Sequence, residues 1–421
     1  MTTSNQTTRR RFLKTSAAAV GVFAVPMIIP QRAFGANERI LTGHVGVGRQ
    51  GSGNLSGFMK HAVAVCDVDK NHMAKAAKRV AKANGKCAAY GDYRQMLERK
   101  DIDAIVCSTP DHWHALVTID ACNAGKDVYC EKPLTLTIRE GRKMVEAARA
   151  NKRIVQTGSQ QRSAGNFRTA CELVRSGRIG KLQKVLVGIP GPNHPGKPGL
   201  DGDPPEHLDY DRWLGPAPKK PYNVKRVHYN FRFFRDYSGG QMTNWGAHHI
   251  DIAQWGMGMD NSGPVAIDGH GTYHKDGWHE VTETCRIEHT YASGVVLIIG
   301  QREKGIPGGT TFIGSEGTIY VNRGRLSSTP GEIIKQPILA GDVHLYESGN
   351  HKGNFLDCIK TRKLAICDVE IGHRSATVCH LSNIACELGR KLKWDPAKEE
   401  FVGDKEAQAL VSRPYRAPWK I

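Results

Sequence analysis

A glycine-rich turn between two apolar runs constrains the fold of this chain more than any other feature. The first apolar run is followed by G-x-G-x-x-G at Gly46, Gly48 and Gly51, and the next run, residues 62–66, ends at Asp67. Glycines at these spacings allow a tight strand-to-helix turn and leave room for a pyrophosphate at the helix N-terminus. A carboxylate at the end of the following strand is placed to accept hydrogen bonds from an adenosine ribose. The pattern predicts a dinucleotide-binding βαβ unit.

Asp67 also bears on which dinucleotide is bound. A 2′-phosphate beside this carboxylate would be repelled, so the sequence favours NAD. Arg49 and Lys70 are close enough in sequence to leave NADP open as the alternative.

Alternating helix and strand patterns continue to about residue 160. Helices are predicted over 70–84, 93–99 and 115–124, and buried parallel strands over 104–107 and 127–130. The turn Ser108-Thr109-Pro110 follows the first of these strands, and Glu131-Lys132-Pro133 follows the second. Because ligands of open α/β sheets bind at the carboxyl ends of the strands, both turns are predicted to contact a ligand.

Together these motifs resemble those of the Gfo/Idh/MocA oxidoreductases, the relatives of glucose–fructose oxidoreductase and inositol dehydrogenase. The run Ser108-Thr109-Pro110-Asp111-His112-Trp113-His114 lies between the glycine turn and Glu131-Lys132-Pro133 in the order and spacing of that family. The resemblance covers nearly all of the chain after its N-terminal segment. It implies an α/β fold, with a Rossmann domain over 37–160. Residues 161–421 would form an α+β domain with an open-faced, largely antiparallel sheet for substrate binding and oligomerisation.

The resemblance implies cofactor contacts along the carboxyl edge of the parallel sheet. The expected contacts are Gly46, Gly48, Gly51, Asp67, Ser108, Thr109, Pro110, His112, His114, Glu131, Lys132 and Gln160. Gln160 is included because it follows a further predicted strand, residues 154–158.

Lys132 is the leading catalytic candidate. In the family, the lysine of the Glu-Lys-Pro step faces both the nicotinamide and the substrate, and the proline peptide is commonly cis. A partly desolvated lysine beside a positively charged ring has its pKa lowered toward the working range of a general base. Such a lysine can take the proton from a hydroxyl group and hydrogen-bond the oxygen that becomes a ketone.

A second catalytic segment is expected around residues 239–251. Asn244, His248 and Asp251 recur at helical spacing, so their side chains can share one face. The family pattern is D-x-x-x-H-x-x-D, in which the histidine works beside the lysine in proton transfer. His248 and Asp251 match this pattern, whereas Asn244 replaces the first aspartate. An amide can orient a substrate or His248 but cannot take a proton, so the resemblance implies catalysis by Lys132 and His248 with Asn244 in an orienting role.

Polar residues of the second half are the remaining candidates. Arg162, Arg232 and Tyr237 could bind sugar hydroxyls or a carboxylate, although surface salt bridges explain the arginines equally well. The predicted substrate-binding set is Lys132, Arg162, Arg232, Tyr237, Asn244, His248 and Asp251. No metal site is predicted, because the spacings of His248, His249 and Asp251, and of His112-x-His114, are not diagnostic.

One segment of the second half is unusually rich in proline. Residues 190–221 hold nine of the twenty prolines, which indicates an irregular segment. Both a lid over the substrate and a packed structural loop are compatible with this composition.

The N-terminal segment predicts where the protein acts. Residues 8–14, Thr-Arg-Arg-Arg-Phe-Leu-Lys, precede a moderate apolar run and a small-residue exit near Gly35, which resembles a Tat export signal. Pro26 and Pro30 interrupt the apolar run, which is too short for a membrane span of about 20 residues. We expect residues 1–36 to be a signal recognised by the Tat translocase and the protein to be periplasmic or otherwise exported.

Charge and cysteine content fit a folded exported protein. Residues 1–36 hold five basic and no acidic residues, so their removal lowers the net charge from +18 to +13. The remaining positive charge is scattered, which does not indicate nucleic-acid binding. The eleven cysteines lie mostly in apolar elements and contain no Cys-x-x-Cys pair, as expected for a protein folded under reducing conditions.

These observations predict an exported NAD(P)-dependent oxidoreductase of a sugar, a polyol or a sugar derivative, working as a homodimer or homotetramer. Because the periplasm offers little free NAD, the cofactor is expected to be held tightly and regenerated in each cycle. The alternative is redox-assisted glycoside cleavage with internally recycled cofactor, although the glycoside-cleaving branch of the family replaces the lysine that this chain keeps. A non-catalytic dinucleotide sensor is a third possibility, against which the export signal and Lys132 both argue.

Overall fold

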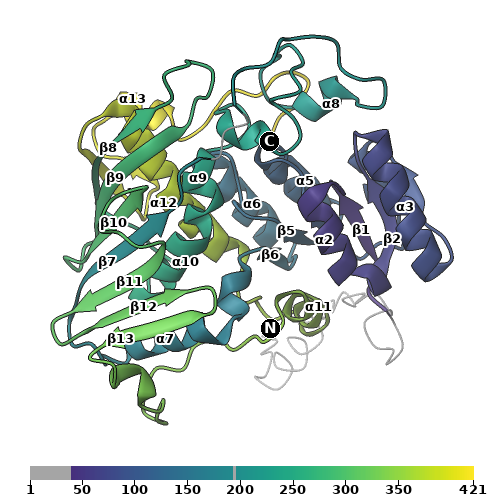
Figure 1. Ribbon diagram of the computed structural model, residues 1–421. Coiled ribbons are helices and arrows are strands. Elements are labelled where there is room, and N and C mark those ends of the chain that lie inside the picture. Colours follow the sequence, from purple (N-terminus) through teal and green to yellow (C-terminus); the bar gives the residue numbers. More distant parts are fainter. Residues whose placement is uncertain (1–38, 193–195) are drawn as a thin grey trace, which may run out of the picture. The chain divides into compact units, whose positions relative to one another are not determined.

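The computed structural model describes residues 39–192 and 196–421 (Figure 1). The predicted export signal, residues 1–36, lies outside the described residues. Within the described ranges, no helix combines the length and the apolar character needed to cross a membrane.

The first half forms a parallel sheet with the strand order β3-β2-β1-β4-β5-β6. Its strands are β1 (Thr42–Val45), β2 (Ala62–Cys66), β3 (Ala88–Tyr90), β4 (Ala104–Cys107), β5 (Asp127–Cys130) and β6 (Val155–Thr157). The connecting helices are α2 (Arg49–Gly57), η2 (Met59–His61), α3 (Lys70–Asn84), α4 (Tyr93–Leu97), α5 (Asp111–Asn123) and α6 (Ile138–Ala150). The strand order reverses between β1 and β4, which opens a ligand crevice at their carboxyl ends.

The local sequence explains where several of these helices begin. Asp69 accepts hydrogen bonds from two backbone amides in the first turn of α3, and Thr137 and Glu140 form a capping box at α6. Helix α5 begins at Asp111, four residues before the predicted start at residue 115. Pro110 precedes it with φ −59°, and the acidic Asp111 suits the positive end of the helix dipole. His112 and His114 therefore lie in the first turn of a helix.

The second half forms a nine-stranded sheet with the order β13-β12-β11-β7-β10-β9-β8-β14-β15. Its strands are β7 (Leu182–Ile189), β8 (Ala266–Tyr273), β9 (Thr282–Thr290), β10 (Val296–Gln301), β11 (Gly309–Gly314), β12 (Thr318–Asn322), β13 (Arg325–Thr329), β14 (Leu392–Asp395) and β15 (Glu400–Phe401). All neighbouring strands are antiparallel except β7 and β10. The predicted fold class, a Rossmann domain followed by a largely antiparallel sheet, is confirmed.

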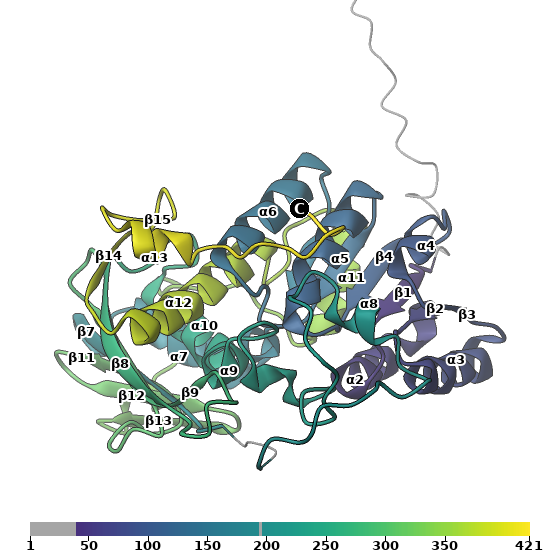
Figure 2. The same ribbon diagram turned by 90° about the horizontal axis from the view of Figure 1, so that it is seen from above.

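Helices cover one face of this second sheet (Figures 1 and 2). They are α7 (Gly165–Arg175), α10 (Gly246–Met257) and α12 (Val369–Leu388), and α12 also packs against α6 of the first half. Side chains such as Leu297 and Phe312 are fully buried beneath them. The remaining helical elements are η3 (Gln160–Ser163), α8 (Tyr210–Leu214), η4 (Asn230–Phe233), α9 (Gly240–Asn244), η5 (Ile333–Lys335), α11 (His351–Thr361) and α13 (Lys405–Ala409).

The described part of the proline-rich segment is packed against the Rossmann domain. The backbone amide of Asp209 donates to the carbonyl of Val68 (2.9 Å), and that of Lys70 donates to the carbonyl of His207 (2.8 Å). Trp213 is 3% exposed within an aromatic cluster that this segment forms with residues 227–237. Of the two interpretations left open by the sequence, the structure favours a packed structural segment.

Candidate active site

The glycine turn leaves a cradle that side chains would fill. Gly46 has φ +77°, and a Cβ there would lie 2.8 Å from the backbone of Ser108. A Cβ on Gly51 would overlap the carbonyl oxygen of Gly46. Helix α2 follows with Gly48 as its N-cap, so no side chain caps its first amides and no acidic residue lies in its first turn. These free amides fit a pyrophosphate group.

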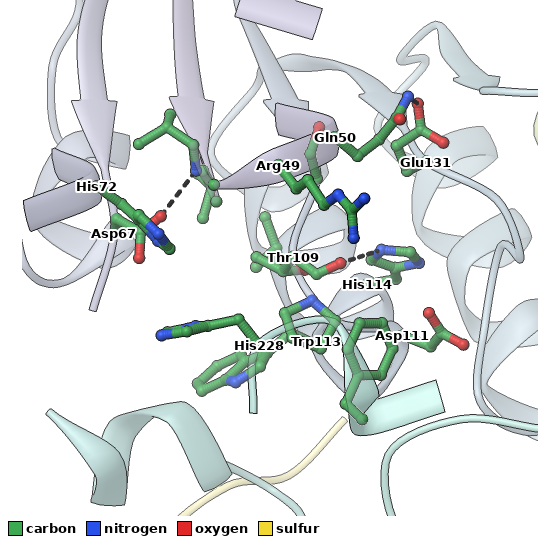
Figure 3. A pocket seen from close by; sticks show the side chains of 18 of the residues that line it. Arg49, Gln50, Asp67, His72, Thr109, Asp111, Trp113, His114, Glu131 and His228 are labelled. Atoms are coloured by element: carbon green, nitrogen blue, oxygen red, sulfur yellow. Dashed lines mark hydrogen bonds between the residues drawn. The ribbon is translucent and has the colours of Figure 1, made fainter. Parts of the chain in front are cut away.

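Asp67 lies at the end of β2 beside this turn (Figure 3). Its Oδ2 accepts a hydrogen bond from the Val47 amide (2.8 Å), and its Oδ1 accepts one from the Asp69 amide (2.9 Å). Each carboxylate oxygen can accept a further bond, so the residue fits a ribose with two hydroxyl groups. Burial raises the pKa of the Asp67 carboxyl, while the two amide bonds act against that rise.

A cavity of about 910 Å³ extends from Asp67 to the second half of the chain. The predicted site residues that line it are Gly46, Gly48, Asp67, Ser108, Thr109, Pro110, His114, Glu131, Lys132, Gln160, Arg232, Asn244 and His248. In Figure 3, Asp67 and His72 lie together at one end, Gln50 and Glu131 at the other, and Arg49 between them. The Rossmann domain and α9, α10 and η4 of the second half thus contribute to one cavity.

Glu131 is the centre of a hydrogen-bond network at the far end of the crevice. Its Oε1 accepts bonds from the side-chain amides of Gln50 (3.1 Å), Asn54 (2.9 Å) and Gln160 (3.4 Å). Asn54 also donates to the Ser108 hydroxyl (2.9 Å), which ties the β4 turn to the β5 turn. The network fixes the backbone that presents Lys132.

Lys132 meets the second half of the chain through Asn244. Its Nζ donates to the Asn244 side-chain oxygen (2.8 Å) and to the Asn244 carbonyl (2.9 Å), at the end of α9. The Asn244 amide nitrogen donates to Gln241 Oε1 (2.9 Å), which keeps its oxygen toward the lysine. The Lys132–Pro133 peptide is cis. Burial, together with the charge of Arg232, lowers the pKa of Lys132 to about 8, against the attraction of Glu131.

His248 lines the same cavity from α10. Burial lowers the pKa of its imidazole well below the usual range, and the positive charges of Lys132 and Arg323 lower it further. The ring is therefore neutral at physiological pH. Its Nδ1 is enclosed by protein atoms, and neither ring nitrogen has a hydrogen-bond partner in the described part of the chain. A ligand in the cavity would therefore meet the ring through Nε2, which can donate or accept one hydrogen bond.

His114 and His112 have different surroundings although both lie in the first turn of α5. His114 Nδ1 faces the Pro133 carbonyl (2.8 Å), and Nε2 faces the Thr109 carbonyl (2.9 Å). A carbonyl only accepts, so both ring nitrogens must donate and the ring is an imidazolium. This ring joins the two ligand-facing turns. His112 instead faces the Trp213 carbonyl through Nε2 (3.0 Å) and is absent from the cavity wall.

Three predicted substrate contacts are turned away from the cavity. Arg162 and Asp251 form a buried ion pair, with Nε to Oδ2 at 2.8 Å, and Arg162 also binds Asp260 at 2.7 Å. Burial lowers the pKa of Arg162, but the two carboxylates outweigh this effect and hold it well above its usual range. Tyr237 is 1% exposed and packs against Trp213 and His112. These three side chains satisfy one another or fill the core, so the structure places them outside the cavity.

The structure adds a cavity residue, Arg323, that the sequence motifs did not reveal. Arg323 reaches the wall from the turn between β12 and β13, and its guanidinium lies 4.8 Å from the ring centre of Trp245. Only the basic, glycine-containing turn Asn322-Arg323-Gly324 marks this position in the sequence. The structure also places Arg232 between the rings of Tyr229 and Phe231, at 4.5 Å from each centre.

Both halves of the chain match models of known protein families. Residues 40–159 match the model "Oxidoreductase family, NAD-binding Rossmann fold", and residues 192–421 match "Oxidoreductase family, C-terminal alpha/beta domain", both of the Gfo/Idh/MocA family. The chain belongs to the Gfo/Idh/MocA oxidoreductase family. Its first domain is an NAD-binding Rossmann domain, in agreement with the glycine cradle and Asp67.

Curated relatives of this Gfo/Idh/MocA protein include two kinds of protein. It is 29% identical over 172 residues to glycosyl hydrolase family 109 protein 1 of Shewanella sp. (strain ANA-3), covering 39% of this chain and 36% of the relative. It is 32% identical over 145 residues to inositol 2-dehydrogenase of Salmonella typhimurium, covering 33% and 42%. The matched segment thus spans less than half the length of these relatives.

Solved structures share the whole fold at low sequence identity. The WlbA dehydrogenase of Bordetella pertussis, in complex with NADH and UDP-GlcNAcA, matches with a TM-score of 0.60 and 19% identity, over 85% of this chain and 99% of its own. Levoglucosan dehydrogenase, in complex with NADH and levoglucosan, matches with a TM-score of 0.62 and 17% identity, over 85% and 99%. These likenesses confirm the two-domain fold.

Proposed function

We propose that this protein is an exported NAD-dependent oxidoreductase that interconverts a secondary hydroxyl group and a ketone on a sugar, a polyol or a sugar derivative. The observation that carries the proposal is the position of Lys132, whose Nζ lies between the two oxygens of Asn244 in the wall of the cavity. The inositol 2-dehydrogenase relative and the dehydrogenase structures with bound sugars support this substrate class. NADP remains the alternative cofactor.

The geometry around Lys132 suits a general base. A neutral amine has two N–H groups and one lone pair, and Asn244 offers two acceptors. With both N–H groups donated to Asn244, the lone pair is left for a hydroxyl proton from the substrate. With a pKa of about 8, roughly one lysine in ten is neutral at pH 7. When bound, the nicotinamide ring takes up or returns the hydride.

His248 would position the reacting hydroxyl. Its neutral ring lines the cavity near the lysine, and Nε2, which has no hydrogen-bond partner among the described residues, offers one donor or acceptor. A hydroxyl group can donate to one neighbour and accept from another, so Lys132 and His248 together define its orientation. Asn244 acts through Lys132 by holding the amine.

Export is proposed from the twin-arginine sequence of residues 8–14. The Tat route carries folded proteins, so the cofactor would be bound before export and reoxidised in place. Arg9→Lys together with Arg10→Lys should retain the protein in the cytoplasm, as measured by cell fractionation. Export of this double variant at the wild-type level contradicts the proposed route.

We also propose a homodimer or homotetramer, because the helices of the described residues pack on one face of the nine-stranded sheet and leave its other face uncovered by any of them (Figure 2). Light scattering of the purified protein measures this directly, and a monomer at micromolar concentration contradicts it.

Redox-assisted glycoside cleavage is the second candidate, favoured by the glycosyl hydrolase family 109 relative. Oxidation at a ring carbon acidifies the neighbouring C–H bond, which permits elimination of the glycosidic oxygen. Water then adds to the resulting unsaturated ketone, and a final reduction restores the sugar. The same lysine and histidine would serve the oxidation step. This activity needs no net turnover of NAD.

One experiment separates the two candidates. Protein purified without added cofactor is incubated with free sugars and aryl glycosides, while nicotinamide fluorescence and products are followed. One reduction per site that stalls until an oxidant is supplied supports the oxidoreductase. Sustained aglycone release without net reduction supports cleavage. Protein that retains NAD and transforms no member of the panel contradicts both.

A further inference from the structure

Three histidines surround one carboxylate oxygen at the Asp67 end of the cavity. The carboxylate belongs to Asp69, at the start of α3, and His72 lies in the first turn of the same helix. His207 and His228 come from the second half of the chain, on either side of α8. Figure 3 shows His72 beside Asp67 and His228 near the same end of the cavity.

Asp69 is held so that one oxygen faces these rings. Its Oδ1 accepts hydrogen bonds from the backbone amides of Asn71 (2.8 Å) and His72 (3.1 Å). Its side chain is 3% exposed. Its Oδ2 lies 3.2 Å from His228 Nε2, 3.6 Å from His207 Nε2 and 4.0 Å from His72 Nδ1. The helix cap therefore fixes the carboxylate and directs its second oxygen to three imidazole nitrogens.

The shortest of these distances equals the edge of a metal coordination tetrahedron, because ligand atoms 2.0–2.1 Å from a zinc ion are separated from one another by about 3.3 Å. The ligand atoms of Asp69, His72 and His228 all lie within 4.8 Å of one another, and His207 Nε2 joins them through its 3.6 Å distance to Asp69 Oδ2. All three histidine side chains are partly exposed, at 35–41%, so small rotations of the rings can close the site.

We propose that Asp69, His72, His207 and His228 form a binding site for a divalent transition-metal ion, with zinc as the preferred occupant. Three imidazole nitrogens and one carboxylate oxygen form a donor set typical of zinc and its neighbours in the first transition row. Calcium and magnesium prefer oxygen ligands throughout, so this set selects against them.

The other histidine-containing clusters of the described residues differ from this one. His114 lies near Cys107 and Cys130, but its two ring nitrogens already face backbone carbonyls. In the loop between β8 and β9, Asp276 accepts backbone bonds from Trp278 and His279 and ion-pairs with His274. This loop cluster joins no distant segments of the chain.

The proposed ion would connect the two halves of the chain at a defined point. Asp69 and His72 belong to the Rossmann domain, whereas His207 and His228 flank the packed segment that contains α8. The backbone bonds between residues 68–70 and 207–209 already align the two segments. The Asp69 amide also donates to Asp67, so the ion would stiffen the loop that presents this carboxylate to the cavity.

Zinc and cobalt titrations of the full chain test the site. Chelator-treated protein is titrated with Zn²⁺ by calorimetry, and bound metal is counted by mass spectrometry after gel filtration. Co²⁺ then serves as a spectroscopic probe, because four-coordinate cobalt absorbs strongly in the visible range. We expect one tight ion per chain at this site and a visible cobalt spectrum. Loss of an outer-sphere partner alone weakens metal binding about 10–100-fold, so His228→Ala should weaken it by more than about 100-fold.

Matched variants assign the ion to this cluster. His207→Ala should also weaken binding, and because its ring is 41% exposed the variant should fold normally, as checked by circular dichroism. His274→Ala in the loop cluster and His270→Ala on β8 should bind zinc as the wild type does. Zinc binding that is unchanged in His228→Ala and His207→Ala, or that is lost in His274→Ala alone, overturns the proposal.

Discussion

Helix α10 carries two polar residues, less than one turn apart, whose surroundings are opposite in character. Asp251 is fully buried, and its carboxylate receives Arg162 Nε (2.8 Å), Arg162 Nη2 (2.9 Å) and the Ser375 hydroxyl (2.7 Å). His248, three residues earlier, lines the cavity near a lysine whose pKa is lowered to about 8, and its ring has no hydrogen-bond partner in the described part of the chain. The protein itself supplies hydrogen-bond partners for the Asp251 carboxylate, whereas its described residues supply none for the His248 ring.

This difference separates structural residues from chemical ones. A buried ion pair with all its hydrogen bonds made is costly to open, so it holds the fold and has no capacity left for a ligand. Polar groups in a cavity that lack a hydrogen-bond partner, or whose pKa is shifted, lower the stability of the fold. They are retained where a bound ligand supplies the missing partner. The predictions below test that division, beginning with the largest effect.

Removing the amine of Lys132 should abolish turnover without unfolding the protein. Lys132→Met keeps the length of the side chain but has no base, and loss of general-base catalysis costs about 10²–10⁴-fold in rate. Turnover is measured with the best substrate of the panel, and NAD binding by fluorescence should be unchanged. The control is the exposed Lys391→Met. Full activity in Lys132→Met would remove the central assignment.

Breaking the buried ion pair between Arg162 and Asp251 should destabilise the protein instead. Asp251→Ala leaves the Arg162 charge buried, with only Asp260 as an ionic partner, which lowers the free energy of unfolding by about 3–5 kcal/mol. Denaturant unfolding measures this, and the folded fraction should keep most of its kcat. Glu347→Gln, which breaks an exposed pair with Arg168, should cost less than about 1 kcal/mol. A large loss of kcat in stable Asp251→Ala would assign it a direct role.

His248→Phe should lower kcat by about 10–100-fold, because a hydrogen bond in the catalytic complex is lost. A phenyl ring fills the space of the imidazole, so the melting temperature should stay the same or rise. Steady-state kinetics and thermal melting check both outcomes. A lower melting temperature with unchanged kcat would place His248 among the structural residues.

The sequence predicts the fold and the Rossmann half of the cavity well, for a physical reason. The glycine turn, Asp67 and the Glu-Lys-Pro step are local: each needs only the end of one strand, and β2, β4 and β5 have their predicted bounds. Partners across the chain are not local. Arg162 and Asp251 are 89 residues apart, and nothing in either segment indicates that the two charges neutralise each other.

Helical spacing in the sequence did not predict correctly which residues of this site act together. Asn244, His248 and Asp251 were expected to share one face, but α9 ends at Asn244 and α10 begins at Gly246. The break lets Asn244 contact Lys132 through both its side chain and its carbonyl. Periodicity within one helix does not reveal such a break, nor does it reveal that Asp251, in α10 with His248, binds Arg162 instead of a ligand. Arg323 and the three histidines around Asp69 were likewise hidden, because they converge from separate segments.

The rate of alcohol oxidation should rise with pH through about 8. Oxidation needs the neutral amine of Lys132, whose pKa is about 8, so the rate should increase roughly tenfold from pH 7 to pH 10. Ketone reduction needs the protonated form and should fall over the same range. His248 titrates well below this window and should not contribute to it. Single-turnover rates over this range check the direction, and a flat oxidation profile would contradict the role of Lys132.

Changing residue 244 should move this pH profile in either direction. Asn244→Asp places a carboxylate where the amide oxygen now lies, 2.8 Å from Nζ, and an opposite charge so close raises the lysine pKa by about 1–3 units. The oxidation midpoint then shifts upward, and the new ion pair resembles the buried pair of Arg162 and Asp251. Asn244→Leu removes a hydrogen bond to the charged form and shifts the midpoint downward. Both variants should approach the wild-type rate once the lysine is neutral. If the two midpoints move in the same direction, Asn244 does not set the pKa of Lys132. The lowered pKa would then result from burial alone.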